Sequence, residues 1–299
     1  MASSLVRELI DAGIHFGHRV SRWNPKMAPY IFGRRNSIHI IDIKQTVKGI
    51  LQASRFISQT VAGGDDVLFV GTKRQARQTV QKHADRCGMH YVSERWLGGT
   101  LTNFRTIRSR LARLEELEGI EATGQVENYS KKMKATIQRE QRKIFRNLAG
   151  IRRMERLPAV LIIIDVKREH IALKEARKLH IPTICLIDTD GDPDYADIPI
   201  PGNDDAMRAV ELVVSYLADA VEAGKKGRLE APSDPQAPRR RSRRPTTARA
   251  DKQPTVEPAA TSTAEQQAEP QVNAESTPTG PAEAHEQVSD QTVQTDEST

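Results

Sequence analysis

The chain has 299 residues, of which 45 are Lys or Arg and 39 are Asp or Glu, and its formal net charge is +6. Cys87 and Cys185 lie far apart with no CxxC pair, which excludes a disulfide framework and a thiolate metal site and suits a reducing cytosol. The longest apolar run, at 159–164, is too short to span a membrane, and the charged residues near the N-terminus do not fit a signal peptide.

The N-terminal part is predicted to form a short helix that ends near Gly13 and then an ordered loop over residues 14–36. Aromatic, glycine and arginine residues are interleaved in this loop without periodicity, which is typical of cations presented around stacking surfaces. A strand at 38–43 and a helix at 45–61 should follow. We expect the loop to bind RNA through five cations, which are Arg19, Arg22, Lys26, Arg34 and Arg35.

Residues 67–92 are predicted to form a βαβ unit: an apolar strand at 67–70, a tight turn, a helix at 73–87 and a second strand at 89–92. The turn carries Gly71-Thr72-Lys73, but the sequence lacks the full GxxxxGK[ST] phosphate loop and any GxGxxG, so a nucleotide site rests on fold analogy alone. Three cations near the ends of these strands are further RNA-binding candidates or solvated residues of the rim: Lys73, Arg74 and Arg95.

Residues 104–157 are predicted to form a basic helical hairpin inserted into the sheet domain. Apolar residues recur at three- and four-residue steps over 104–117 and again over 130–151, with glycines between them, which indicates two antiparallel, coiled-coil-like helices. The segment holds fourteen Lys and Arg against seven Glu, a net charge of +7. We expect phosphate contacts from Arg105, Arg108, Arg110, Lys131, Lys132, Lys134, Arg139, Arg142 and Arg146.

The second half alternates strands at 159–165, 183–188 and 198–201 with helices at 169–179 and 203–222. The predicted fold class is therefore α/β, a doubly wound parallel sheet formed by residues 1–103 and 158–226, with the α-helical coiled-coil hairpin inserted at 104–157. After Leu229 the chain has no Leu, Ile, Met, Phe, Trp or Tyr, so residues 227–299 are predicted to be a disordered low-complexity tail.

A divalent-cation site is one hypothesis for the carboxyl ends of the strands. Asp188 ends a predicted strand, and Asp204 and Asp205 open the last helix, so these carboxylates can converge with His18 at one sheet edge. Imidazole together with carboxylates suits zinc or magnesium. Helix capping explains Asp204 without any metal, and no cofactor is otherwise required.

No GxSxG, HExxH or calcium-loop pattern is present, so the sequence favours a protein that is not an enzyme and has no small-molecule substrate.

Eight segments together closely resemble the bacterial-type small-subunit ribosomal protein S2 family, in order and over about residues 4–225. They lie at 12–18 (AGIHFGH), 23–27, 30–33, 38–42, 69–73, 95–99 (RWLGG), 188–189 and 200–206 (IPGNDDA). The resemblance implies a flavodoxin-like domain with a protruding coiled-coil insertion. It also implies a structural, ribosome-bound cytoplasmic protein that contacts small-subunit ribosomal RNA and neighbouring ribosomal proteins and helps to dock ribosomal protein S1.

Two other classes remain open at this point: a cytosolic enzyme or nucleotide-binding module on the same fold, and a protein-only scaffold that uses the hairpin as a docking arm. Trp96 can be a packing anchor of the hinge or a stacking surface. The arginine cluster at 239–244 can touch RNA or pair with the acidic end of the tail, where residues 250–299 carry one Lys against ten Asp and Glu.

Overall fold

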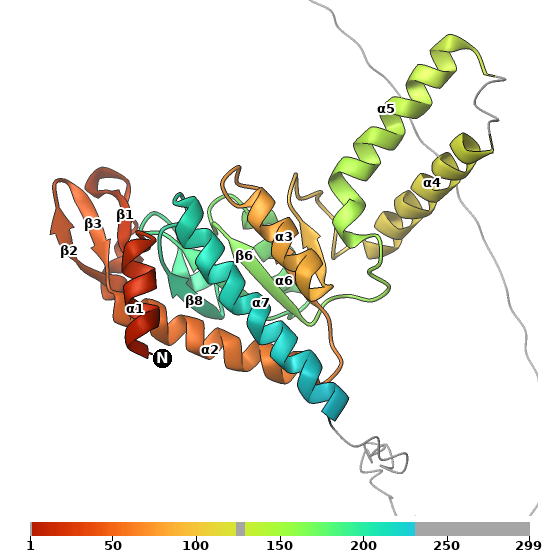
Figure 1. The fold of residues 1–299 in the computed structure, drawn as a ribbon. Coiled ribbons are helices and arrows are strands. Elements are labelled where there is room, and N and C mark those ends of the chain that lie inside the picture. The colour runs from red at the N-terminus through yellow and green to blue at the C-terminus, as the bar shows by residue number, and fades with distance from the viewer. Residues whose placement is uncertain (1, 124–128, 231–299) are drawn as a thin grey trace, which may run out of the picture. The chain divides into compact units, whose positions relative to one another are not determined.

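The computed structural model describes residues 2–123 and 129–230. Its centre is a five-stranded, all-parallel sheet in the order β5-β4-β6-β7-β8 (Figure 1). Every neighbouring pair is joined through a helix or a long connection, as parallel strands require. This arrangement confirms the predicted doubly wound α/β fold. The strands are β4 (Val67–Val70), β5 (His90–Val92), β6 (Val160–Ile164), β7 (Thr183–Ile187) and β8 (Ile198–Pro201).

Alternate residues of the central strands enter two separate cores, because side chains along a strand point to opposite faces. On one face Val67 and Phe69 pack against four helices, and on the other Leu68 and Val70 pack against α6 and the base of the hairpin. Both faces are therefore covered, which explains the continuous apolar runs of β4, β6 and β7. The four helices are α1 (Ala2–Asp11), α2 (Ile43–Ala62), α3 (Arg77–Cys87) and α7 (Met207–Glu230), and α6 spans His170–Lys178.

Residues 16–41 form a small antiparallel sheet in the order β1-β3-β2, so the prediction of an ordered loop over 14–36 was wrong for its two strands. The pairing is irregular in register on both sides of β3, which conceals the two-residue alternation that marks a strand in sequence. Asn36 and Ser37 both have positive φ, as a two-residue type I′ turn requires. The elements are β1 (Phe16–Arg19), β2 (Ile31–Arg35) and β3 (Ile38–Ile41), with short 3₁₀ helices at Val20–Arg22 and Pro25–Tyr30.

Two long helices, α4 (Phe104–Ala122) and α5 (Lys131–Leu148), form the hairpin between β5 and β6 and contact each other (Figure 1). The inner face of α4 is buried, whereas Met133 on the predicted seam of α5 is 51% exposed. Ser130 caps α5 by accepting a hydrogen bond from the Met133 amide. A hairpin is therefore present, and its coiled-coil packing stays a prediction.

The domain boundaries also stay predictions. All described residues belong to one compact unit, and α7 continues through residues 227–230, past the predicted start of the tail. Residues 231–299, with the arginine cluster and the acidic end of the tail, lie outside the described residues. Among the helices of the described ranges, none combines the length and apolar character that a membrane crossing demands.

Candidate nucleic-acid interface

The hairpin presents its predicted cations to solvent. Eight of the nine are exposed and Lys134 is half-buried. Within residues 2–123 and 129–230, Arg146 is the only one of the nine that forms an ion pair, with Glu94, and Arg108 donates to the Met154 carbonyl oxygen. The positive charge of the other eight is therefore available to a polyanion. Two further arginines of the segment, Arg113 and Arg152, are instead paired with glutamates of α4.

The cations near the N-terminus differ in their availability. Arg19 and Arg22 are exposed at the end of β1 and in the 3₁₀ helix after it, and Arg34 and Arg35 are exposed on β2. Lys26, in contrast, donates to Asp192 at 2.9 Å and to Asp194 at 2.5 Å, and these hydrogen bonds raise its pKa. The structure therefore leaves four arginines of this region free of ion pairs among the described residues and compensates the charge of Lys26.

The three candidate cations at the sheet edge are likewise not equivalent. Lys73 lies 2.7 Å from Asp204 and 2.5 Å from Asp205. Burial opposes the charged form of Lys73, but these two hydrogen bonds outweigh it, and its pKa is raised. Arg74 and Arg95 are exposed, without an ion pair in the part of the chain that the structure describes. We conclude that Lys73 neutralises the protein's own carboxylates.

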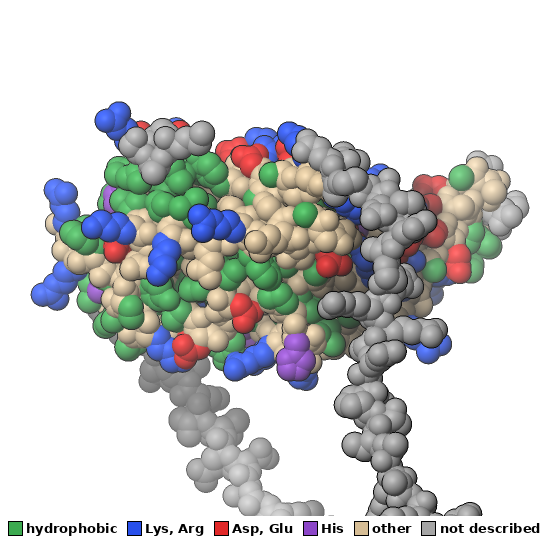
Figure 2. Space-filling view, turned by 90° about the horizontal axis from the view of Figure 1, so that it is seen from below, with side chains coloured by type: hydrophobic (Ala, Val, Ile, Leu, Met, Phe, Trp, Pro, Cys, Tyr) green, Lys and Arg blue, Asp and Glu red, His purple; other side chains and the backbone are tan. Residues whose placement is uncertain are grey.

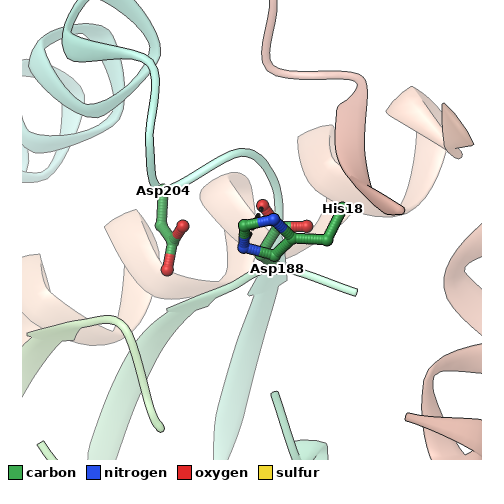
Figure 3. Close-up of side chains that lie close together, drawn as sticks. All are labelled: His18, Asp188 and Asp204. Atoms are coloured by element: carbon green, nitrogen blue, oxygen red, sulfur yellow. Dashed lines mark ion pairs between the residues drawn. The ribbon is translucent and has the colours of Figure 1, made fainter. Parts of the chain in front are cut away.

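The predicted metal ligands do converge at the carboxyl edge of the sheet. His18, Asp188 and Asp204 come from β1, from the end of β7 and from the loop before α7, and one donor atom of each lies within 4.8 Å of the others (Figure 3). His18 Nε2 also lies 3.7 Å from Asp190 and 3.8 Å from Asp205. The main-chain amide of His18 donates to the Thr189 hydroxyl, which fixes β1 over the end of β7.

Burial makes this cluster electrostatically unusual. Desolvation and the neighbouring Asp165 raise the pKa of Asp204 to about 7, although Lys73 lowers it, and burial raises the pKa of Asp188. Both carboxylates are 2% exposed. Lys73 pairs with Asp204 and Asp205, and Lys167 lies 3.2 Å from Asp190, so no ammonium group among the described residues pairs with Asp188. A divalent cation held by His18, Asp188 and Asp204 would suit this imbalance. Asp205 fits such a site less well, because its side chain is 47% exposed and it is not one of the three residues whose donor atoms converge.

Glu175 is a functional part of the scaffold that the sequence did not reveal. Its buried carboxylate accepts hydrogen bonds from the main-chain amides of Gly99, Leu101 and Thr102, and from the Trp96 indole at 3.1 Å. Burial would raise its pKa, but these donors outweigh it and the pKa is lowered. Trp96 is 6% exposed, so it is a packing anchor and not a stacking surface. The only sequence signal was the glycine pair, which lets the loop wrap around the carboxylate.

Comparison with known proteins decides the family. The family model described as "Ribosomal protein S2" matches residues 9–224. The chain belongs to the ribosomal protein S2 family. It is 58% identical over 237 residues to "Small ribosomal subunit protein uS2" of Rhodopirellula baltica, which covers 79% of this chain and 91% of that protein. It is 50% identical over 230 residues to the protein of the same name from Syntrophobacter fumaroxidans, which covers 77% of this chain and 84% of that protein.

The S2 family is structural and not enzymatic, so the expectation that this chain is not an enzyme is confirmed. The family match stops at residue 224 and leaves the tail outside it. The RWLGG segment, one of those that carry the resemblance, belongs to the loop that Glu175 organises, and the IPGNDDA segment carries Asp204 and Asp205.

Proposed function

We propose that this protein acts in translation as a structural, ribosome-bound component of the small ribosomal subunit in the cytoplasm, and that it binds ribosomal RNA through phosphate contacts. The names of its relatives place them in the small subunit. The observation that supports the RNA contact is the set of exposed hairpin cations without ion pairs among the described residues. Arginine and lysine side chains of this kind supply most of the affinity in protein–RNA binding, without reading the base sequence.

The first experiment is sedimentation of the tagged full chain with ribosomal subunits. We expect it to migrate with the small subunit, and its affinity for small-subunit ribosomal RNA to fall by roughly 0.7 to 0.9 log units per log unit of salt for each phosphate neutralised. A triple variant, Arg105→Glu, Arg110→Glu and Lys132→Glu, should abolish the co-sedimentation. The control with the same change of charge is Lys44→Glu with Lys48→Glu and Arg55→Glu, three exposed cations of α2. Unchanged sedimentation of the hairpin variant would refute the RNA contact and favour a protein-only docking arm.

A second contact of the proposed role is with ribosomal protein S1. Hydrophobic side chains gather over the end of the described domain that carries β1, β2 and β3, with Lys and Arg among them (Figure 2). Phe32 is 79% exposed and Phe16 48% exposed, and a cavity of about 650 Å³ beside Phe32 is lined mainly by apolar residues of α1, β3 and α2. Exposed apolar patches of this kind mark protein interfaces. We propose this surface as the place where S1 docks.

Surface plasmon resonance with immobilised S1 tests this contact. Phe32→Ala together with Phe16→Ala should weaken binding at least tenfold, about the loss expected for interface aromatic residues. Leu51→Ala is the control, since Leu51 is an exposed apolar residue of α2 that is 49% exposed. Equal binding by the Phe variant and the control would remove the docking assignment and leave the RNA contact untouched.

The metal site is a separate proposal, supported by the convergence of His18, Asp188 and Asp204. One divalent cation, zinc or magnesium, would offset the buried acidic charge and tie β1 to the ends of β7 and β8. Metal analysis of the purified full chain after zinc or magnesium loading should give about one ion per chain, and His18→Ala should lose it. His170→Ala, an exposed histidine of α6, is the matched control. Equal, substoichiometric metal in the parent and both variants would refute the metal site.

A further inference from the structure

A strongly cationic cavity lies where the hairpin meets the sheet. Its volume is about 610 Å³, and Thr72, Glu94 and Asn147 form part of its wall. Six cations complete it, against the single carboxylate of Glu94: Arg77, Arg95, Arg142, Lys143, Arg146 and Arg168. Arg77, Lys143 and Arg168 are not among the cations that sequence reasoning selected. The excess of cations favours an anion as the occupant. The cavity joins side chains of α3 and α5 with residues that follow three strands, β4, β5 and β6.

The cavity lies at the topological switch point of the sheet. The chain order reverses between β4 and β6, and Thr72 and Arg168 follow these two strands. Ligands of open α/β sheets bind at this position. Here, however, the Thr72 amide already donates to the buried Glu169 carboxylate at 3.0 Å. The Thr72 amide is thus already occupied by a carboxyl group of the same chain, and the cavity offers an external anion the cationic side chains of its wall.

Two of the arginines are held in fixed orientations. The Arg77 guanidinium donates to the Thr72 carbonyl oxygen at 3.1 Å and to Glu94 at 2.9 Å, and Arg168 Nε donates to the Thr72 hydroxyl at 2.9 Å. Arg146 donates to the same Glu94 carboxylate. A fixed guanidinium loses less side-chain entropy when it binds phosphate, and its planar donors match phosphate oxygens.

A smaller cavity of about 240 Å³ adjoins the first one and shares three residues of its wall: Glu94, Arg146 and Asn147. Its remaining wall includes Tyr91 and Phe145. Phe145 is 54% exposed on a helix whose other solvent-facing residues are mostly basic or polar. An exposed aromatic ring beside a cationic cavity is the arrangement that stacks an unpaired base while cations hold the adjoining phosphate.

We propose that the two cavities together hold one unpaired nucleotide of an RNA strand, with its phosphate among Arg142, Lys143 and Arg168 and its base against Phe145. The inference rests on the proposed function, because it names the RNA feature that the base of the hairpin recognises. A strand is favoured over a free nucleotide for two reasons. The exposed cations of α5 continue from the cavity along the hairpin, and the main-chain amide of the turn after β4 is occupied by Glu169.

Fluorescence anisotropy of the full chain tests this site with three probes: a labelled single-stranded 12-mer RNA of mixed sequence, a labelled RNA duplex and labelled AMP. Phe145→Ala should weaken single-strand binding roughly tenfold, as for a lost stacking partner, and leave duplex binding within about twofold. Arg142→Gln with Lys143→Gln should lower the single-strand salt slope by roughly 0.7, the value for the one phosphate that these two side chains hold. Lys131→Gln with Lys132→Gln, far from the cavity along α5, should weaken both RNA probes alike.

Phe145 and Lys143 are exposed, so these variants should retain the thermal stability of the parent. Wild-type affinity of the Phe145 variant for the single strand overturns the nucleotide site, while the Lys131 and Lys132 result still supports the proposed function. Binding of AMP as tight as that of the 12-mer, lost in the Arg142 and Lys143 variant, replaces the RNA site with a free-nucleotide site. Absence of RNA binding by the wild-type chain removes the proposed function and this site with it.

Discussion

The carboxyl edge of the sheet and the hairpin treat charge in opposite ways. At the sheet edge, anions and donors of the same chain satisfy each other: Glu175 occupies the loop at 96–102, Glu169 occupies the turn after β4, and Lys73 pairs with Asp204. On the hairpin, eight predicted cations have no ion pair within the described residues. The same residue types are therefore structural in one region and available for a partner in the other. The number of charged residues does not distinguish the two regions. The hydrogen-bond and ion-pair partners of each side chain distinguish them.

The largest effect should come from removing the internal anion at Glu175. Glu175→Ala leaves the buried Leu101 amide, the partly buried Gly99 and Thr102 amides and the Trp96 indole without this acceptor, so we expect a loss of about 3 kcal/mol or more in the free energy of unfolding. Chemical denaturation of the full chain measures it. Glu175→Gln keeps one acceptor oxygen and should cost less, and Lys174→Ala, exposed on the same helix, should cost little. A loss below about 1 kcal/mol for Glu175→Ala would show that the loop does not depend on this carboxylate.

Removing the ammonium of Lys73 should have the next largest effect. Lys73→Met leaves the buried acids uncompensated and should destabilise the protein by about 2 kcal/mol at pH 7. The cost should shrink at pH 5, because Asp204, whose pKa is about 7 in the folded protein, is then mostly protonated. The neighbouring Arg74→Met removes an exposed charge and serves as control. Equal destabilisation by both variants would show that the Lys73 ammonium contributes no more to stability than a solvent-exposed cation.

The pH dependence of stability tests the same edge with a smaller effect. The pKa of Asp204 is raised from its ordinary value of 3.8 to about 7 on folding, so the folded state holds this proton more tightly than the unfolded state. The stability that this proton contributes is therefore fully present below pH 3.8 and is lost as the pH rises through about 7. Asp204→Asn should remove this slope in urea denaturation curves of the metal-free protein, kept in chelator, recorded between pH 4 and 8. An identical pH profile for both proteins would contradict the raised pKa.

Much of the fold followed from local patterns, while the partners of the charged residues did not. The apolar runs of β4 and β6 and the helical period of α2 are local signals, and each element was predicted within a few residues. The strands β1 and β2 were missed because irregular register removes their alternation. Lys26 meets acids more than 160 residues away in the chain, and Glu175 meets amides more than 70 residues away. Such contacts depend on the complete fold, so the spacing of residues in the sequence does not predict them.

The smallest stability effect should come from the hairpin cations, and it separates the two regions most directly. Arg105 and Arg110 lie exposed on one helix near other cations, and no described carboxylate pairs with them. Arg105→Gln with Arg110→Gln should thus change the free energy of unfolding by no more than about 0.5 kcal/mol, the usual range for surface substitutions. Affinity for ribosomal RNA should nevertheless fall, because each lost phosphate contact reduces the number of counterions that are released when the protein binds RNA. Parallel denaturation and RNA-binding titrations measure both. A destabilisation as large as that of Lys73→Met would mean that the hairpin cations, like those of the sheet edge, serve the fold.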